Sequence, residues 1–381
     1  MPLTTKSTLQ NLEKSAIRKF AVMGAETPGC ISLTLGEPDL NTAEEIKELV
    51  NVQLAANDTH YPPNNGKPFL REAIAEHEKT RGLNYSSDEI IVTVGATQAL
   101  FVSLSTVLDP GDEVIILAPA YTLYASVTSL NGATPIIVDT SANNFQVTPE
   151  MLADAVSPRT KAIVLNTPNN PTGCILNAQS LQAIADAARE NDFYVICDDV
   201  YGRLVYADGY KSFGESFPEL RDRTVICDSF SKPYAMTGWR LGWIAADEAF
   251  ITAAGKIQQF NISSVPSFVQ NAAAKALTTD VAPTLEIYRK RRELVLDRLD
   301  AMGLDVVTPE GAFYALPNIQ EFGIGSDELC ERLIKEAGVA FIPGSCFGAE
   351  GHIRLSYCCA MEDLEEGLDR MEKFLGSLTK E

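Results

Sequence analysis

Histidine is scarce in this sequence, and the scarcity restricts the chemistry available to it. Only His60, His77 and His352 occur among 381 residues. The sequence therefore offers few candidate residues for a hydrolase that depends on a histidine base or for a metal site built from several histidines. No G-x-G-x-x-G fingerprint follows a predicted strand, which removes the strongest argument for a dinucleotide enzyme. We predict no metal centre.

Positive charge is also in short supply. Lysine and arginine total 31 against 51 aspartate and glutamate residues, which gives a net charge of -20. This balance argues against binding to nucleic acid or to anionic lipid, and it favours small molecules as partners. No stretch reaches the roughly 18 apolar residues that a membrane span needs, and the first 20 residues lack a secretory signal pattern. We predict a cytoplasmic protein, in which the eight cysteines, without a C-x-x-C pair, are reduced.

Short β-rich runs alternate with helical patterns from Thr42 to about Asp280, which is typical of a sheet wound with crossover helices. Many of the runs are continuously apolar, as expected for parallel strands covered on both faces. The predicted strands are Glu89–Val94, Glu113–Leu117, Pro135–Val138, Lys161–Leu165, Phe193–Cys197, Thr224–Asp228 and Leu241–Ala245. The fold class is therefore α/β, with a mostly parallel seven-stranded sheet between helices.

The pattern changes after Pro283 to a long helix, with Tyr288, Val295, Leu299 and Met302 on one face, followed by short strands and two further helices. We predict a large domain over residues 45–285. Residues 1–44 and 286–381 form a smaller α+β domain in this interpretation.

The segment that begins at Ser229 is the most informative for chemistry. It follows a predicted strand and contains Ser231, Lys232 and Arg240. A lysine at the carboxyl end of a strand lies where open α/β sheets bind ligands, and burial there would lower the pKa of its amine so that it can attack an aldehyde. Arg240 offers a bidentate fork to a phosphate, and Ser229 and Ser231 offer hydroxyl donors. A solvated surface lysine is the alternative.

Three more strand ends carry polar groups. Gly95, Ala96 and Thr97 lie where a strand gives way to a helix, and free backbone N–H groups at such a point favour an anion. Asn170 lies in an Asn-Pro-Thr-Gly turn after another strand. Asp198 ends a third strand, and a buried carboxylate there needs a partner. A protonated ring nitrogen would serve, and an arginine is the structural alternative.

These motifs together resemble the class I, fold-type I aminotransferases that depend on pyridoxal phosphate. The resemblance extends from about Ile31 to Leu355. It is carried by Leu35-Gly-Glu-Pro-Asp39, Asn170-Pro-Thr-Gly173, Asp198 with Tyr201, Ser229-x-x-Lys232 with Arg240, and Arg354-Leu-Ser356. Ile17-Arg-Lys-Phe20, and Gly303-Leu-Asp-Val-Val307 before Gly311-Ala-Phe-Tyr314, are similar to the acetyl-diaminopimelate and aspartate aminotransferase-like subgroup.

The resemblance implies a role for each matching residue. Lys232 would form the Schiff base with pyridoxal phosphate and move protons, and Asp198 would keep the pyridine nitrogen protonated. Tyr201 and Asn170 would bind the phenolic oxygen, and Tyr121 would stack on the ring. The residues implied to bind the phosphate are Gly95, Ala96, Thr97, Ser229, Ser231, Arg240 and, from the neighbouring subunit of a homodimer, Tyr61.

The resemblance also implies a substrate site and a reaction. Arg354 would clamp the α-carboxylate, helped by Asn170 and the backbone of Gly36, which orients the Cα–H bond across the ring plane. The implied reaction moves an amino group between an L-amino acid and a 2-oxo acid, with 2-oxoglutarate as the default acceptor. Arg18, Lys19 or Lys67 would meet a distal carboxylate or are solvated surface charges.

Two alternatives stay open at this stage. A C–S β-lyase would use nearly the same cofactor residues, because elimination and transamination start from the same Cα carbanion. A non-catalytic module that binds the cofactor is the second alternative. The roughly 40 residues before the sheet are too few for a separate DNA-binding domain, and the acidic charge opposes DNA contact.

Overall fold

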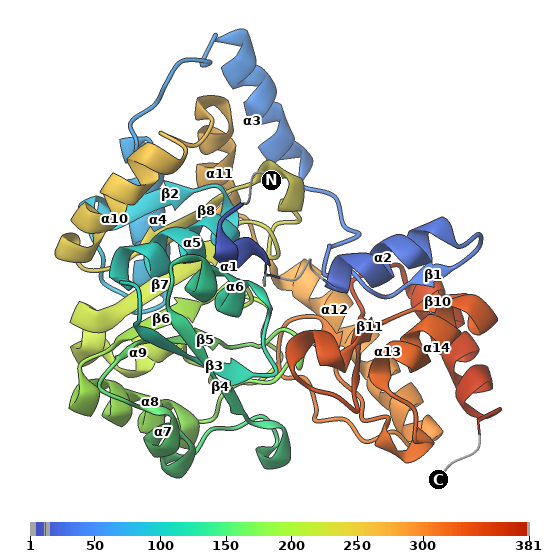
Figure 1. The fold of residues 1–381 in the computed structure, drawn as a ribbon. Coiled ribbons are helices and arrows are strands. Elements are labelled where there is room, and N and C mark those ends of the chain that lie inside the picture. Colours follow the sequence, from blue (N-terminus) through green and yellow to red (C-terminus); the bar gives the residue numbers. More distant parts are fainter. Residues whose placement is uncertain (1–4, 11, 13–15, 379–381) are drawn as a thin grey trace.

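The computed structural model describes residues 5–10, 12 and 16–378. A seven-stranded sheet forms its centre, in the order β2-β8-β7-β6-β5-β3-β4 (Figure 1). The strands are β2 (Ile90–Thr93), β3 (Glu113–Ala118), β4 (Thr134–Asp139), β5 (Thr160–Asn166), β6 (Tyr194–Asp198), β7 (Thr224–Ser229) and β8 (Gly242–Ala245). Each of the seven predicted strands is present, with ends that differ by a few residues.

Strand β8 alone runs against the direction of the other six strands in this sheet. It pairs antiparallel with both β2 and β7, whereas the remaining pairs are parallel. The amino end of β8 therefore lies at the same edge of the sheet as the carboxyl ends of its neighbours. Residues just before β8 and residues just after the parallel strands are thus brought to one edge.

Helices cover both faces of the sheet, which explains the continuous apolar runs. In β6, Val195 and Cys197 belong to one buried cluster, and Ile196 between them belongs to the cluster on the opposite face. The first face is covered by α3 (Glu44–Ala55), α4 (Pro68–Thr80), α7 (Pro149–Ala155), α8 (Ala178–Asn191), α9 (Phe213–Ser216) and α11 (Gln270–Ala276). The second face is covered by α5 (Gly95–Val107), α6 (Leu123–Leu130) and α10 (Glu248–Asn261).

A third apolar cluster lies beside the sheet and is built mainly from the two ends of the chain. Its elements are α2 (Ala16–Glu26), β1 (Ile31–Ser32), α12 (Ala282–Met302), β9 (Tyr314–Ala315), α13 (Ser326–Arg332), β10 (Val339–Ala340), β11 (Ile342–Pro343), β12 (Ile353–Ser356) and α14 (Met361–Leu375). The short α1 (Ser7–Gln10) does not belong to this cluster and contacts α6 instead. Figure 1 shows α12, α13 and α14 grouped to one side of the sheet. Of the predicted face of α12, Tyr288, Val295 and Leu299 are buried, and Met302 is partly buried against the same cluster.

The predicted division into residues 45–285 and residues 1–44 with 286–381 stays a proposal. The grouping of apolar clusters supports it, although α12 begins at Ala282, before the proposed boundary. Residues 1–4, 11, 13–15 and 379–381 of the smaller part lie outside the described residues. Within the described part, no helix has the length and apolar character needed to cross a membrane.

A buried group of charged side chains connects the end of α4 to the ends of β6 and β7. Arg81, which follows α4, donates to Asp199 over 2.8 Å, and it lies 3.4 Å from both Glu78 and Asp228. Burial raises the pKa of each of these three carboxyl groups, and the arginine opposes that shift. Because Asp199 and Asp228 adjoin Asp198 and Ser229, the group fixes the edge of the sheet where the candidate site lies.

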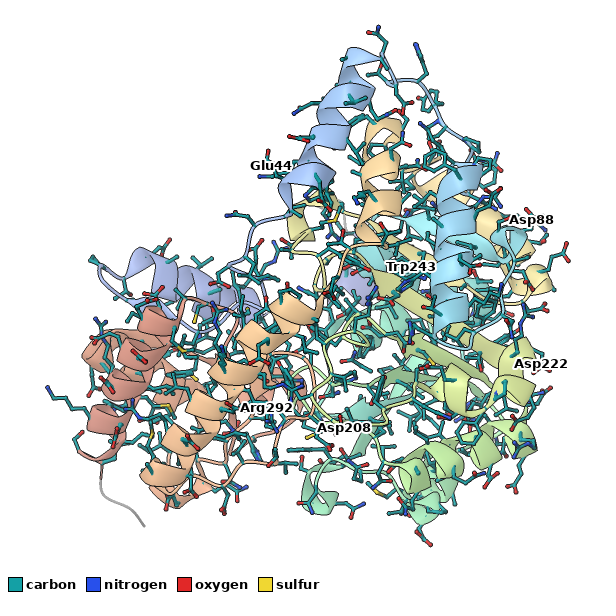
Figure 2. The ribbon with its side chains drawn as sticks, turned by 180° about the vertical axis from the view of Figure 1, so that it is seen from behind. Glu44, Asp88, Asp208, Asp222, Trp243 and Arg292 are labelled. Atoms are coloured by element: carbon teal, nitrogen blue, oxygen red, sulfur yellow. The ribbon has the colours of Figure 1, made fainter. Side chains whose placement is uncertain are left out.

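Trp243 in β8 packs over this charged group. Its indole N–H donates to Glu78 over 2.8 Å, and its ring meets Phe230 and His77 edge-on, with centroids 5.0 Å and 6.0 Å away. Figure 2 shows Trp243 in the interior, whereas Asp88 and Asp222 project at the periphery. The interior position of Trp243 follows from its place on a strand that is buried on both faces.

Candidate active site

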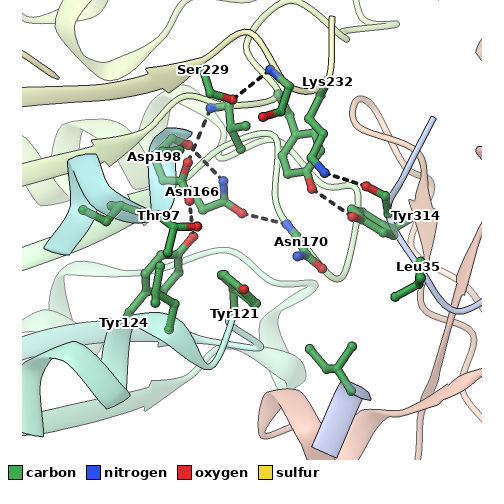
Figure 3. Close-up of a pocket in the computed structure, with 18 of the residues that line it drawn as sticks. Leu35, Thr97, Tyr121, Tyr124, Asn166, Asn170, Asp198, Ser229, Lys232 and Tyr314 are labelled. Atoms are coloured by element: carbon green, nitrogen blue, oxygen red, sulfur yellow. Dashed lines mark hydrogen bonds between the residues drawn. The ribbon is translucent and has the colours of Figure 1, made fainter. Parts of the chain in front are cut away.

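A cavity of about 230 Å³ opens at the edge of the sheet defined by the ends of β5, β6 and β7 and the start of β8. One side is formed by this edge, and the other side by segments of the third cluster, as Figure 3 shows for Leu35 and Tyr314. The predicted site residues that line the cavity are Gly36, Ala96, Thr97, Tyr121, Asn170, Asp198, Tyr201, Ser229, Ser231, Lys232, Arg240 and Arg354. Residues far apart in the sequence thus face one space.

Lys232 reaches into this cavity from the loop that follows β7. Its Nζ donates a hydrogen bond to the backbone oxygen of Gly36 over 2.5 Å. Burial lowers the pKa of the Lys232 amine. An amine with a lowered pKa is more often neutral, and a neutral amine is the form that attacks a carbonyl carbon.

Asp198 is the last residue of β6 and is only 4% exposed. Its side chain accepts a hydrogen bond from the hydroxyl of Tyr124 over 2.6 Å, and its backbone oxygen accepts one from Asn166 (Figure 3). Burial raises the pKa of Asp198 to about 6, although the Tyr124 hydrogen bond opposes the shift. No arginine among the described residues forms an ion pair with Asp198, because Arg81 pairs with Asp199 instead.

Arg354 of β12 is 2% exposed and faces the cavity from the third cluster. It donates to the side-chain oxygen of Asn170 over 2.8 Å and to the backbone oxygen of Thr34. Its guanidinium contacts the rings of Tyr314 and Phe347, 4.5 Å and 4.8 Å from their centroids. The Nε atom is buried without a partner in the described structure, so a donor remains available for a carboxylate.

Arg240 brings a second guanidinium to the cavity, on the opposite side. It lies just before β8 in a left-handed conformation, with φ of 55° and ψ of 58°. It donates to the backbone oxygens of Thr237 and Val94, and no carboxylate in the described ranges pairs with it. A Cβ atom on Gly95 would lie 2.7 Å from the Nη2 of Arg240, so a side chain at position 95 would displace the guanidinium, and the φ of 73° also favours glycine there.

The start of α5 completes this side of the cavity. The helix begins at Gly95, whose φ is 73°, and its second and third residues, Ala96 and Thr97, line the cavity. The first backbone N–H groups of a helix have no partner within the helix. Together with Arg240 and the hydroxyls of Ser229 and Ser231, they form a set of donors suited to an anion such as a phosphate.

Two predicted residues lie elsewhere. Gly95 stands beside Arg240 but does not itself line the cavity. Tyr61 is 93% exposed and does not line the cavity of its own chain either. Its exposure agrees with the expectation that it acts on a neighbouring subunit, which stays a prediction.

Three residues of the site were not assigned from the sequence. Tyr124 follows Tyr121 by three residues and turns its hydroxyl toward Asp198. Asn166 ends β5 and also accepts from the backbone N–H of Asn170 over 2.7 Å. Tyr314, in the Gly-Ala-Phe-Tyr motif, lines the cavity and meets the hydroxyl of Tyr201 over 2.8 Å. Asn166 could have been predicted from the sequence, because it directly follows the predicted strand Lys161–Leu165.

Comparison with known proteins shows which family has this arrangement. The family model described as "Aminotransferase class I and II" matches residues 28–371. The chain belongs to this family. An aspartate aminotransferase of Pyrococcus abyssi is 43% identical to it, over 96% of this chain and 97% of that protein. A Bacillus subtilis protein named "Probable N-acetyl-LL-diaminopimelate aminotransferase" is 40% identical, over 96% and 94% of the two chains.

A solved structure supports the same conclusion for the fold of this aminotransferase. The aspartate aminotransferase from Thermus thermophilus, crystallised with maleate, matches with a TM-score of 0.93 and 37% identity. The match covers 98% of this chain and the whole of that chain. The predicted family, its similarity to this subgroup and the fold class are therefore confirmed, and the enzyme is an aminotransferase.

Proposed function

We propose that this aminotransferase holds pyridoxal phosphate on Lys232 and transfers an amino group between an L-amino acid and a 2-oxo acid. One observation carries the proposal. A lysine with a lowered pKa, a buried carboxylate and two arginines face a single cavity, and among the described residues neither the carboxylate nor either arginine forms an ion pair. Bound pyridoxal phosphate would supply an aldehyde that captures the amine and a ring that takes up electrons from the substrate Cα.

The donor set fits this cofactor. Ser229, Ser231, Arg240 and the backbone at the start of α5 would hold the phosphate, and Tyr121 would stack on the ring. Asn170 and Tyr201 would bind the phenolic oxygen. Asp198, held by the hydroxyl of Tyr124, would keep the ring nitrogen protonated, because an ionised carboxylate stabilises an adjacent positive charge.

The residues of the other side would position the substrate. Arg354 would bind the α-carboxylate in a bidentate manner, with its unpartnered Nε toward the substrate, and the amide of Asn170 would assist. Position 36 accommodates only glycine, because a Cβ atom there would lie 1.6 Å from the Tyr314 hydroxyl. The Lys232 amine, when freed, would carry the proton that leaves Cα.

The proposal includes a homodimer in the cytoplasm. Tyr61 would reach the phosphate bound by the neighbouring subunit. Its 93% exposure supports this, because the side chain is free to enter an interface between subunits.

Absorbance spectroscopy tests the function. The purified protein should carry a cofactor band that disappears when a suitable amino donor is added and returns when a 2-oxo acid is added. L-cystathionine distinguishes the lyase, because elimination yields pyruvate and ammonia without any 2-oxo acid present. A band that no amino acid changes would instead indicate binding without turnover.

Replacing Tyr124 with phenylalanine should weaken cofactor binding at mildly acidic pH. The Tyr124 hydrogen bond lowers the pKa of Asp198, so its removal raises that pKa above the wild-type value of about 6. The carboxylate that the ring nitrogen needs is then lost at a higher pH as the solution is acidified. We expect the pH at which cofactor affinity falls by half to rise in the variant, by about half a unit or more.

Fluorescence titration of the apoprotein with pyridoxal phosphate between pH 5 and pH 8 measures this shift. The ionisations of the free cofactor are common to both proteins and cancel in the comparison. An identical pH dependence in the two proteins would contradict the role of Tyr124.

We further propose 2-oxoglutarate as the acceptor, with Arg18 as the cation for its distal carboxylate. Lys19 and Lys67 already pair with Glu331 and Asp58. Arg18 is exposed, has no acidic partner among the described residues, and follows Ile17, which lines the cavity. Burial raises the pKa of Tyr121, and the charge of Arg18 is one influence that lowers it, which supports a place for Arg18 near the cavity mouth.

The variant Arg18→Gln should lose kcat/KM with 2-oxoglutarate by about tenfold, because a hydrogen bond to a charged group contributes about 1.5 kcal/mol or more. With pyruvate, which has no distal carboxylate, the loss should stay below about twofold. Lys19→Gln is the matched control, since it removes an adjacent charge that is already paired. It should leave kcat/KM unchanged with both acceptors. An equal loss with both acceptors in Arg18→Gln would overturn this assignment.

A further inference from the structure

Tyr314 occupies the junction between the two sides of the cavity. It lies in β9, is 2% exposed, and its hydroxyl is 2.8 Å from the hydroxyl of Tyr201 (Figure 3). The two rings meet edge-on, with centroids 5.7 Å apart. Since both side chains are buried, this hydrogen bond is shielded from competition by water.

The direction of this hydrogen bond follows from counting protons. Each phenol has one O–H proton to donate, and its oxygen can also accept. Under the proposed function, on which this step rests, Tyr201 donates its proton to the phenolic oxygen of the cofactor. The proton between the two tyrosines must then come from Tyr314, with the Tyr201 oxygen as acceptor. A phenol that accepts a hydrogen bond is a stronger donor in turn, because chains of hydrogen bonds polarise one another.

The same side chain is also fixed from the substrate side. The guanidinium of Arg354 lies 4.5 Å from the centroid of the Tyr314 ring. The Tyr314 hydroxyl fills the space that a side chain at position 36 would need, and the backbone oxygen of Gly36 accepts from Lys232. Tyr314 is therefore in contact with the proposed carboxylate clamp and with the residue that holds the lysine.

We infer that Tyr314 is a positioning residue that acts through Tyr201. Its hydroxyl orients and strengthens the hydrogen bond from Tyr201 to the phenolic oxygen of the cofactor, and its ring supports Arg354. When that hydrogen bond weakens, more negative charge stays on the phenolic oxygen, and the nearby Lys232 nitrogen then holds its proton more tightly. Loss of the Tyr314 hydroxyl therefore raises the pH at which this proton leaves.

The test compares Tyr314→Phe with Tyr288→Phe in the holoenzyme. Tyr288 is the matched control, because it is buried in the same cluster, contacts Phe313 and has a hydroxyl without a partner in the described structure. The absorbance of the bound cofactor is titrated with pH. We expect the midpoint to rise by about half to one unit in Tyr314→Phe and to stay at the wild-type value in Tyr288→Phe.

Two further measurements separate positioning from a general structural role. In a Tyr201→Phe background, Tyr314→Phe should shift the midpoint no further, because the hydroxyl through which it acts is absent. The KM for the amino acid should change less than about twofold, since phenylalanine keeps the ring beneath Arg354, while kcat falls by about three- to tenfold.

An unchanged midpoint in Tyr314→Phe, an equal shift in Tyr288→Phe, or a full additional shift in the Tyr201→Phe background would each overturn the inference. A wild-type protein that binds no pyridoxal phosphate would instead refute the proposed function. The two failures are distinguishable, because the second is seen before any variant is made.

Discussion

Replacing Lys232 with alanine is expected to reduce transamination by at least about a thousandfold and to remove the covalent link to the cofactor. Under the proposed function, the variant lacks the amine that would attack the aldehyde and move the proton at Cα. Borohydride treatment followed by peptide mass analysis measures the link directly. In the wild type the label should be found on the peptide that contains Lys232, and in the variant it should be absent.

Lys211→Ala is the control for this experiment. Lys211 is exposed and lies outside the cavity, so its loss should leave both turnover and labelling unchanged. A Lys232→Ala protein that keeps near-wild-type transamination would refute the proposed function as a whole.

Asp198→Asn is expected to lower kcat/KM by about a hundredfold to a thousandfold, with the fold retained. Asparagine keeps the shape and can still accept from Tyr124, but it has no charge to stabilise a protonated ring nitrogen. The ring then becomes a poorer acceptor for the electrons of the Cα–H bond. Steady-state kinetics with a saturating cofactor concentration measures the loss, and circular dichroism checks the fold.

Asp139→Asn provides a matched comparison, because Asp139 ends β4 of the same sheet but is exposed and lies outside the cavity. It should keep its activity within about twofold. If Asp198→Asn retained more than a tenth of the wild-type activity, the ring nitrogen would not depend on this carboxylate.

The sheet was predictable from the sequence because its strands are buried on both faces and read as continuous apolar runs. Each strand end was correct to within a few residues. The polar groups at those ends could be predicted because they directly end or follow the apolar runs. Asp198 and Ser229 are the last residues of β6 and β7, where parallel strands present ligand-binding groups. Arg240 precedes β8 rather than following a strand. It lies at the same edge of the sheet as Asp198 and Ser229 because β8 runs in the opposite direction.

Other parts of the site depend on contacts that local sequence patterns do not encode. Tyr201 and Tyr314 are 113 residues apart, and their hydrogen bond requires the third cluster to pack against the sheet edge. Tyr124 and Asp198 are 74 residues apart in the sequence, and their hydrogen bond also depends on tertiary packing. The position of Arg354 was implied by resemblance alone, since nothing in its strand distinguishes a carboxylate clamp from an arginine in a surface ion pair.

The left-handed backbone of Arg240 has a consequence for engineering. A residue with a Cβ atom at this φ is strained by about 1–3 kcal/mol, and glycine or asparagine would relieve the strain. Methods that optimise thermostability position by position will therefore favour replacing Arg240 and will remove the guanidinium that faces the start of α5. A heat-resistant version of this enzyme should be designed with position 240 held fixed, because the proposed phosphate-binding role of Arg240 opposes maximal stability there.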